Sequence, residues 1–166
     1  MNLNELLGTE FPLIQGGMAN IATAPFAAAV SNAGGMGLIG GGGMDADAFR
    51  AQIRLCRRLT DQPFGVNIML MHPQAGAMAQ IAAEEHVGFI TTGAGNPAPY
   101  LPLWKQAGAK VFPVVAAVAL AKLVERAGAD GVIAEGLGNH AAVEQADAAL
   151  ADKGDLVDLH VNHLPM

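Results

Sequence analysis

Short apolar segments recur along the chain, separated by longer stretches that are rich in alanine. Each segment contains Val, Ile, Leu or Phe and is largely unbroken by charge. Continuous apolar runs of this length are typical of strands covered on both faces, as the strands of parallel sheets are. The pattern predicts six parallel strands, at Pro12–Gln15, Met36–Gly40, Phe64–Met69, Gly88–Thr92, Lys110–Val115 and Gly131–Glu135.

The alanine-rich stretches predict one helix for each crossover between parallel strands. Three of them run into a glycine, at Gly34, Gly108 and Gly128, and glycine favours the left-handed conformation that closes a helix. Asp45 is a candidate N-cap, and Pro25 suits a first helical turn. The predicted helices are Ala24–Ala33, Asp45–Leu59, Gln74–Glu85, Pro99–Ala107 and Ala117–Ala127.

Regular alternation of strands and helices indicates an α/β fold, and two arrangements of it compete. Glycines at 35, 37 and 40 formally match a dinucleotide fingerprint, which would indicate an open doubly wound sheet. That fingerprint follows a strand and opens a helix, whereas these glycines precede a strand and run through it. We interpret them as capping and close-packing positions. The sequence therefore predicts a partial (β/α)8 TIM barrel with six of the eight β/α units.

The character of the chain changes after residue 137. Asn139–Lys153 predicts a polar helix, and residues 154–166 form a short mixed stretch and a tail. No seventh or eighth unit of the earlier kind follows. We expect residues 1–137 to form the partial barrel and residues 138–166 to form a divergent helix and tail.

Composition and charge exclude several classes of function. The chain has 166 residues, a net charge of −6 and scattered basic residues, so it offers nucleic acid no basic surface. No apolar run has the length needed to cross a bilayer, and the N-terminus lacks the features of a signal peptide. The single cysteine, Cys56, excludes an internal disulfide framework. We expect a cytoplasmic protein that binds neither nucleic acid nor membranes.

Candidate chemistry lies where the predicted strands end, because β/α barrels form their active sites at the carboxyl ends of the strands. Glycine is frequent there, notably at 40–43, and lets backbone approach a flat or anionic ligand. Amides at Gln15 and Asn67 suit the donor–acceptor edge of a flavin or nucleobase. The alternatives are plain loop flexibility for the glycines and partners within the fold for the amides.

Histidines are the candidate acid–base groups. His72 and His140 lie at the predicted rim, whereas His86 follows a helix at the opposite end and is interpreted as structural. Cys56 lies within a predicted helix and is interpreted as a packed residue. No His, Cys or acidic residues have the spacing of metal ligands, so we predict no metal site.

Several stretches resemble the nitronate monooxygenase superfamily, also called 2-nitropropane dioxygenases. The first carries the motif FPLIQGGMA, and the others follow in the order that the superfamily has. Within the superfamily the chain is most similar to bacterial FMN-dependent enoyl-ACP reductase II. The matching stretches are Phe11–Ala19, Ala27–Gly35, Phe64–Leu70, Thr91–Pro97 and Ala129–Gly136.

The resemblance implies FMN across the barrel mouth of residues 1–137. For a reductase, it implies NAD(P)H as electron donor and an enoyl thioester as substrate, with acyl carrier protein as a candidate partner. For the nitronate-oxidising branch, it implies an alkyl nitronate and dioxygen instead. The residues implied as cofactor-binding are Gln15, Gly16, Gly17, Met18, Asn67, Thr92, Gly93 and Glu135.

The chain departs from the family pattern in two places. The family places its usual catalytic histidine after a Gly-Gly pair, whereas Glu135–His140 reads EGLGNH, and His140 is kept as the candidate catalytic residue. The last two strands, whose loops hold the FMN phosphate in the family, are missing, which predicts truncation after about residue 137. A non-catalytic barrel fragment is therefore an alternative. Its exposed sheet edges predict a homo-oligomer that covers them.

Overall fold

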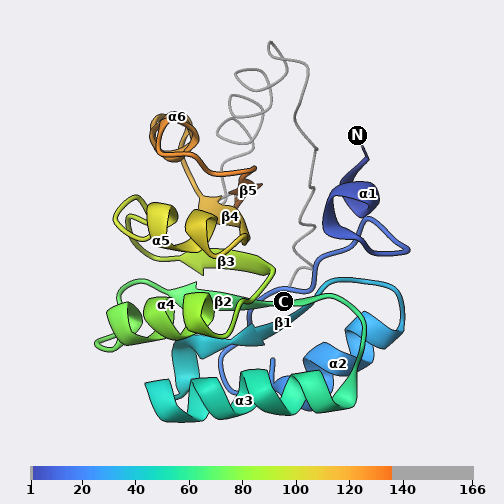
Figure 1. Cartoon of the computed structure of the whole chain (residues 1–166). Helices are drawn as coiled ribbons and strands as arrows, with labels where there is room; N and C mark the ends of the chain where they lie inside the picture. Colours follow the sequence, from blue (N-terminus) through green and yellow to red (C-terminus); the bar gives the residue numbers. More distant parts are fainter. Residues whose placement is uncertain (1, 136–166) are drawn as a thin grey trace, which may run out of the picture.

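Five parallel strands form the sheet of the computed structural model, which describes residues 2–135. They lie side by side in chain order (Figure 1): β1 (Gly37–Gly40), β2 (Phe64–Met69), β3 (Phe89–Gly93), β4 (Lys110–Val115) and β5 (Ile133–Ala134). A doubly wound sheet reverses its strand order at a switch point, whereas a barrel adds each strand beside the previous one. The described sheet follows the order of a barrel, as predicted. The helix predicted over Asn139–Lys153, the tail and His140 lie outside the described residues.

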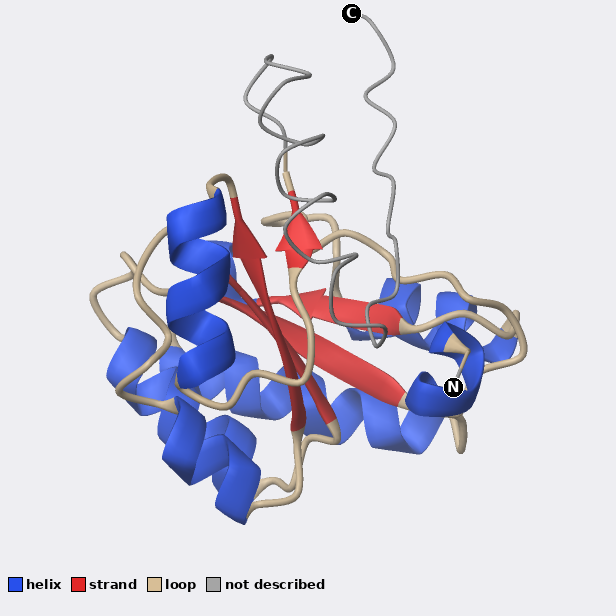
Figure 2. Ribbon diagram, turned by 90° about the horizontal axis from the view of Figure 1, so that it is seen from above, coloured by secondary structure: helices blue, strands red, loops and turns tan. Residues whose placement is uncertain are grey.

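Helices fill the predicted crossovers and cover one face of the sheet (Figures 1 and 2). An additional short helix, α1, precedes them and packs against the other face. The helical elements are α1 (Leu3–Leu7), α2 (Ala24–Asn32), the 3-10 turn η1 (Gly41–Gly43), α3 (Ala46–Leu59), α4 (Ala75–Glu84), α5 (Leu101–Gln106) and α6 (Val118–Arg126).

The first predicted strand, Pro12–Gln15, is reduced to one parallel bridge between Ile14 and Met36, so the prediction of a full strand was wrong. Two backbone hydrogen bonds make this bridge. The N–H of Met36 donates to the carbonyl of Leu13 at 2.8 Å, and the N–H of Gln15 donates to the carbonyl of Met36 at 2.9 Å. The ladder stops there because the side chain of Gln15 occupies the next position along β1.

The last predicted strand, Gly131–Glu135, is also shorter than expected and covers Ile133–Ala134. Ahead of it, a side chain takes the place of one backbone acceptor. The carboxylate of Asp130 accepts a hydrogen bond from the N–H of Val111 at 2.7 Å and pairs with Lys105. The N–H of Asp130 also donates to the carbonyl of Val111 at 3.0 Å, so one backbone bond and one acidic side chain fix the approach to β5.

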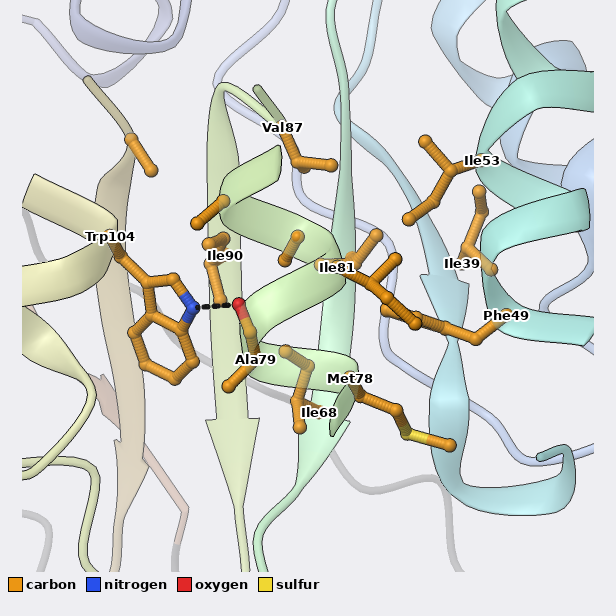
Figure 3. Packing of buried hydrophobic residues seen from close by; sticks show 14 of the residues in the cluster. Ile39, Phe49, Ile53, Ile68, Met78, Ala79, Ile81, Val87, Ile90 and Trp104 are labelled. Carbon is orange, nitrogen blue, oxygen red and sulfur yellow. Dashed lines mark hydrogen bonds between the residues drawn. The ribbon is translucent and has the colours of Figure 1, made fainter. Parts of the chain in front are cut away.

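The larger hydrophobic core lies between the sheet and the outer helices (Figure 3). Strand residues Ile39 and Ile90 meet helix residues such as Phe49 and Trp104, and all four are fully buried. The indole N–H of Trp104 donates to the carbonyl of Ala79 at 3.0 Å, so the one polar atom of this ring is satisfied inside an apolar layer.

A second apolar cluster fills the inner face of the sheet near the amino ends of the strands. It contains Leu38, Phe89 and Phe112, packed with the leucines of α1. The two phenylalanine rings lie 5.2 Å apart between centroids, in a tilted arrangement that aromatic pairs prefer. Lys110 donates to the carbonyl of Leu6, which ties α1 to β4. Helix α1 thus covers the inner face of the sheet at the amino ends of the strands. The carboxyl ends of the strands are not covered by α1.

Glutamine side chains link successive β/α units at the starts of helices. The N–H of Ala24, the first residue of α2, donates to Oε1 of Gln52 in α3 at 2.7 Å. The N–H of Ala46, the first residue of α3, donates in the same way to Oε1 of Gln74, just before α4, at 2.9 Å. Helix N-termini leave such N–H groups without intrahelical partners, so each contact satisfies one of them.

Cys56 lies on the buried side of α3, in the outer core, with none of its surface exposed. Burial raises the pKa of its thiol to about 11. The thiol therefore stays protonated at neutral pH and is a poor nucleophile. Cys56 is a packed residue, as interpreted from the sequence.

Glu85, at the end of α4, is the centre of an ionic cluster between α3 and α4. Its carboxylate accepts hydrogen bonds from Arg50 at 3.0 Å, Arg54 at 2.9 Å and Arg57 at 3.0 Å. Burial raises the pKa of Glu85, but the hydrogen bonds and charges of the three arginines lower it further, and the net shift is downward. The negative form of Glu85 is therefore stabilised in the folded state.

This cluster predicts a loss of stability in acid. Because the pKa of Glu85 is lower in the folded chain than in the unfolded one, its contribution is complete above the ordinary value of 4.5 and is lost as the pH falls through the folded-state pKa. We expect Glu85→Gln to flatten the acid side of the profile and lower stability at pH 7. Urea unfolding from pH 7 to pH 3 measures both; parallel profiles for the two proteins would contradict the cluster's role.

Among residues 2–135, every α-helix except α3, which runs into the extended Thr60, is followed within two residues by a left-handed residue, and one of these residues is not glycine. After α5, Gly108 takes φ +85° and donates to the carbonyl of Lys105. After α4, His86 takes φ +48° and donates to the carbonyl of Ala83 in the same way. Gly34 and Gly128 are also left-handed at their helix ends. A histidine therefore stands where the equivalent helices use glycine, which has no Cβ to strain.

We expect His86→Gly to raise the free energy of unfolding by about 0.5–1 kcal/mol. The left-handed conformation costs a residue with Cβ about 1–2 kcal/mol, and the entropy of glycine in the unfolded chain offsets about half of that. The matched control is Gly108→Ala, where an added Cβ meets no atom within 4 Å, so only the conformational cost acts and the free energy falls. Equilibrium urea unfolding measures both changes, and a destabilised His86→Gly would contradict the assignment of strain.

The outer edge of residues 12–15 faces no strand among residues 2–135. Phe11 and Leu13, beside this edge, are 49% and 53% exposed. An unpaired edge with apolar neighbours is a surface that other chains pair with readily. Self-association through it stays a prediction. No helix between residues 2 and 135 has both the length and the hydropathy to cross a membrane.

Candidate functional site

Polar side chains meet on the inner face of the sheet, at the carboxyl ends of the strands. Side chains alternate between the two faces of a strand. The strand registers place Gly40 of β1 beside Asn67 of β2, and Asn67 beside Thr91 of β3. The layer below them is the apolar inner cluster. Asn67 therefore stands above an apolar floor, between a residue without a side chain and a hydroxyl group.

Asn67 is held in place by its neighbour and keeps hydrogen-bonding capacity for a ligand. Its Nδ2 donates to Oγ1 of Thr91 at 2.8 Å. Thr91 itself is buried, whereas Asn67 is partly exposed. Within residues 2–135, no group donates to Oδ1 of Asn67, which leaves this oxygen as an acceptor at the mouth.

The loop after Gln15 lies directly on Asn67. A Cβ added to Gly17 would come within 2.3 Å of the Cβ of Asn67, so the loop can approach this closely only as glycine. Gly16, Gly17 and Met18 are all exposed, and no acceptor among the described residues takes their N–H groups. The loop thus presents a run of free backbone donors next to the Asn67 amide.

The side chain of Gln15, in contrast, is occupied within the fold. Its Nε2 donates to the carbonyls of Gly16 at 3.0 Å and Leu38 at 3.1 Å, and its Oε1 accepts from the N–H of Leu38 at 3.2 Å. The residue is 8% exposed. Both amide hydrogens are therefore used. The structure gives Gln15 a bridging role beside the site, whereas its predicted cofactor contact stays a prediction.

The glycines at 40–43 approach the neighbouring loop. A Cβ on Gly40 would lie 2.9 Å from the carbonyl of Met18, and one on Gly43 would lie 2.3 Å from the side chain of Asn20. The N–H of Gly40 donates to the carbonyl of Ala22 at 2.8 Å. The close approach expected from these glycines is therefore real, but its described partner is protein. The glycines at 40–43 allow the loop after β1 to pack closely against the loop that contains Met18 and Asn20.

Thr92 faces away from this group, and Glu135 follows β5, two strands along the sheet from Thr91. Thr92 shares the strand face of Ile90, which packs in the outer core, so it is Thr91 that points toward Asn67. Glu135, after β5, is exposed, and its N–H donates to the carbonyl of Val115 at 3.0 Å. Thr91 begins one of the stretches that resemble the family, but the sequence did not assign it to the site. Its position opposite Asn67 in the strand register places it there.

The carboxyl end of β3 is joined to the loop after β2. The N–H of Leu70 donates to the carbonyl of Gly93 at 2.9 Å, and a Cβ on Gly95 would lie 2.7 Å from the Cβ of Leu70. His72, in the same loop, accepts a hydrogen bond at Nδ1 from the N–H of Gln74 at 3.1 Å. Because Nδ1 accepts, the proton of the neutral ring is on Nε2. His72 thus helps to order this loop.

A cavity of about 360 Å³ lies at the other end of the strands. Met36, Phe64, Phe89 and Lys110 line it with Arg57. Arg57 is in the last turn of α3, and the other four residues are at or just before the amino ends of the strands, so the apolar inner cluster lies between the cavity and Asn67. Active sites of barrels form at the carboxyl ends, and the group around Asn67 is the candidate site.

Residues 1–87 match the family model described as nitronate monooxygenase, which is more than half of the chain. The chain belongs to the nitronate monooxygenase family. It is 35% identical to a 5-hydroxy-7a-methyl-1-oxo-octahydro-1H-indene-4-carboxyl-CoA dehydrogenase of Mycobacterium tuberculosis, over 81% of this chain and 38% of that protein. It is 31% identical to a nitronate monooxygenase of Paraburkholderia phytofirmans, over 86% of this chain and 50% of that protein.

Solved structures of family relatives superpose on the described arc. FabK from Thermotoga maritima matches with a TM-score of 0.85 and 46% identity, over 89% of this chain and 50% of that one. Nitroalkane oxidase from Streptomyces ansochromogenes matches with a TM-score of 0.73 and 27% identity, over 81% and 48%. The predicted partial TIM barrel is confirmed. The chain spans about half the length of these relatives.

Gly17→Ala tests the contact between the rim loop and Asn67. The added Cβ overlaps the Cβ of Asn67, so either the loop or the asparagine must move, and we expect a loss of about 1–3 kcal/mol in the free energy of unfolding. Gly88→Ala is the matched control, because its Cβ meets nothing within 4 Å. Urea unfolding measures both variants; equal stability of Gly17→Ala and the parent chain would contradict the close contact.

Proposed function

We propose that this chain binds FMN at the carboxyl ends of β1–β3 and acts as an oxidoreductase of the enoyl-ACP reductase II type. The observation that carries the proposal is a partly free asparagine amide beside backbone N–H groups that have no partner among residues 2–135. Asn67 provides the amide, and Gly16, Gly17 and Met18 provide the N–H groups. Membership of the nitronate monooxygenase family supports it.

The residues present fit a flavin ring. The edge of an isoalloxazine alternates acceptors and donors, and the site offers N–H donors from the loop together with the Oδ1 acceptor and remaining Nδ2 proton of Asn67. Gly17 keeps the loop close to Asn67, so both can reach the same planar group. Met18 and Met69, each 38% exposed, supply apolar and polarisable surface at the mouth.

The proposed reaction reduces the carbon–carbon double bond of an enoyl thioester. One hydride, derived from NAD(P)H, reaches the β-carbon and one proton reaches the α-carbon, so NAD(P)⁺ and the saturated thioester are the products. FMN, when bound, supplies the two-electron relay between the nucleotide and the thioester. This chain's loop and Asn67 orient that group. We assign the proton donor to His140, which lies outside the described residues.

Nitronate oxidation is the second candidate, because curated relatives at 31% and 33% identity are named nitronate monooxygenases. The reductase is preferred because identity to FabK of Thermotoga maritima is 46%, against 27% for the nitroalkane oxidase. Both candidates need the same cofactor. They differ in whether a reduced nucleotide or the organic substrate donates the electrons.

Flavin binding is tested first, on the purified 166-residue chain. We expect FMN to bind with quenching of its fluorescence, and Asn67→Ala to raise the Kd at least tenfold, or about 1.4 kcal/mol, because a ring contact is lost. Asn32→Ala is the matched control. Its side chain accepts from Thr60 at 2.6 Å, at the end of α2, so its Kd should stay unchanged.

A chain that ignores added FMN would overturn the proposal and leave the non-catalytic alternative. If FMN binds, two assays separate the candidate reactions. Consumption of NADH or NADPH with crotonyl-CoA indicates the reductase, whereas oxygen uptake with an alkyl nitronate, without nucleotide, indicates the monooxygenase. Asn67 and the Gly16–Met18 loop would hold the ring of the flavin and not its phosphate, so riboflavin should compete with FMN for the same site.

A further inference from the structure

The bridge between residues 13–15 and β1 is the start of a parallel ladder that does not continue. Its two backbone bonds join Leu13 and Gln15 to Met36. In a parallel pair, the next rung repeats this pattern two residues later. It would run from the N–H of Leu38 to the carbonyl of Gln15, and from the N–H of Gly17 to the carbonyl of Leu38.

The side chain of Gln15 takes both ends of that missing rung. Its Oε1 accepts from the N–H of Leu38 at 3.2 Å, and its Nε2 donates to the carbonyl of Leu38 at 3.1 Å. The second Nε2 proton goes to the carbonyl of Gly16 at 3.0 Å. One amide side chain thus satisfies two backbone groups of β1 that would otherwise bind the first segment.

We propose that Gln15 is a positioning residue, whose side chain keeps the backbone of Gly16–Met18 off the edge of β1. Because Leu38 is already satisfied, the N–H of Gly17 has no strand partner in the described part of the chain and remains available at the mouth. The inference rests on the proposed function, in which these N–H groups meet the flavin ring. It gives Gln15 a role other than the cofactor contact predicted from the sequence.

The chemistry of this position calls for glutamine. Leu38 presents one donor and one acceptor, and an amide matches both, whereas a carboxylate matches only the donor and an apolar side chain matches neither. Gln15 is 8% exposed, so water does not readily replace these bonds. Without the amide, the backbone itself is the available partner for Leu38, and Gly17 is drawn into the ladder.

Gln15→Met tests this, because methionine has a similar length and no amide. Ser31→Ala is the matched control, because Ser31 lies in α2 and its hydroxyl also contacts β1. The hydroxyl of Ser31 also bridges two backbone groups, accepting from Gly37 at 3.2 Å and donating to Pro63 at 2.8 Å, but at the amino end of β1. Both variants lose a buried bridge, and only Gln15→Met loses the one beside the site.

Two measurements are made on each chain. Without flavin, amide hydrogen exchange should show Gly17 protected at least tenfold more in Gln15→Met than in the parent chain, with no change at Gly17 in Ser31→Ala. With flavin, the Kd for FMN and for riboflavin should rise at least tenfold in Gln15→Met and less than twofold in Ser31→Ala. If Gln15→Met does not fold, Gln15→Glu replaces it, since it keeps an acceptor for Leu38 but loses both donors.

The outcomes separate the two proposals. A parent chain that binds FMN, with Gln15→Met binding equally well or Gly17 remaining unprotected in it, overturns the positioning role and leaves the proposed function standing. A parent chain that does not bind FMN overturns the proposed function, and the exchange of Gly17 alone then decides whether Gln15 holds the backbone off β1. Equal losses of FMN affinity in Gln15→Met and Ser31→Ala also overturn the positioning role, since general loosening would explain them.

Discussion

Close backbone packing around β1 is the constraint on which the rest of the structure depends. A Cβ on Gly37 would lie 1.9 Å from the carbonyl of Ala27, so α2 rests directly on the strand. A Cβ on Gly40 would lie 2.9 Å from the carbonyl of Met18, so the rim loop does the same at the other end. With any side chain at these positions, the helix and the loop would both move outward. The loop would then no longer reach Asn67.

Much of the fold could be predicted because both faces of the sheet are apolar near the amino ends. The runs Phe64–Met69 and Lys110–Val115 are strands with the predicted bounds. Asn67 could be found as well, since an amide inside an apolar strand needs a partner or a ligand. The neighbours of Asn67 could not be predicted, because the strand pairing decides which residue lies opposite it and on which face. Thr91 lies opposite Asn67, and the adjacent Thr92 faces the outer core.

Other features could not be predicted because a side chain makes hydrogen bonds expected of the backbone, or because the backbone fills space expected for a ligand. The first strand stops early since the amide of Gln15 substitutes for a rung, which no hydrophobic pattern reveals. The glycines at 40–43 pack on a neighbouring loop, and the sequence alone does not show whether a run of glycines approaches protein or a ligand. His86 lies just after α4, away from the carboxyl ends of the strands as expected, but its left-handed conformation follows from its helix end and leaves no mark in composition.

The links made by Gln52 and Gln74 carry a consequence for the order of assembly. Within residues 2–135, the first N–H of α2 is satisfied only by a residue of α3, and that of α3 only by a residue just before α4. During synthesis from the N-terminus, α2 and α3 would therefore leave the ribosome incompletely capped, and the unit that follows would complete each of them. Assembly of these β/α units would therefore proceed from the N-terminus, with each newly made unit stabilising the one before it.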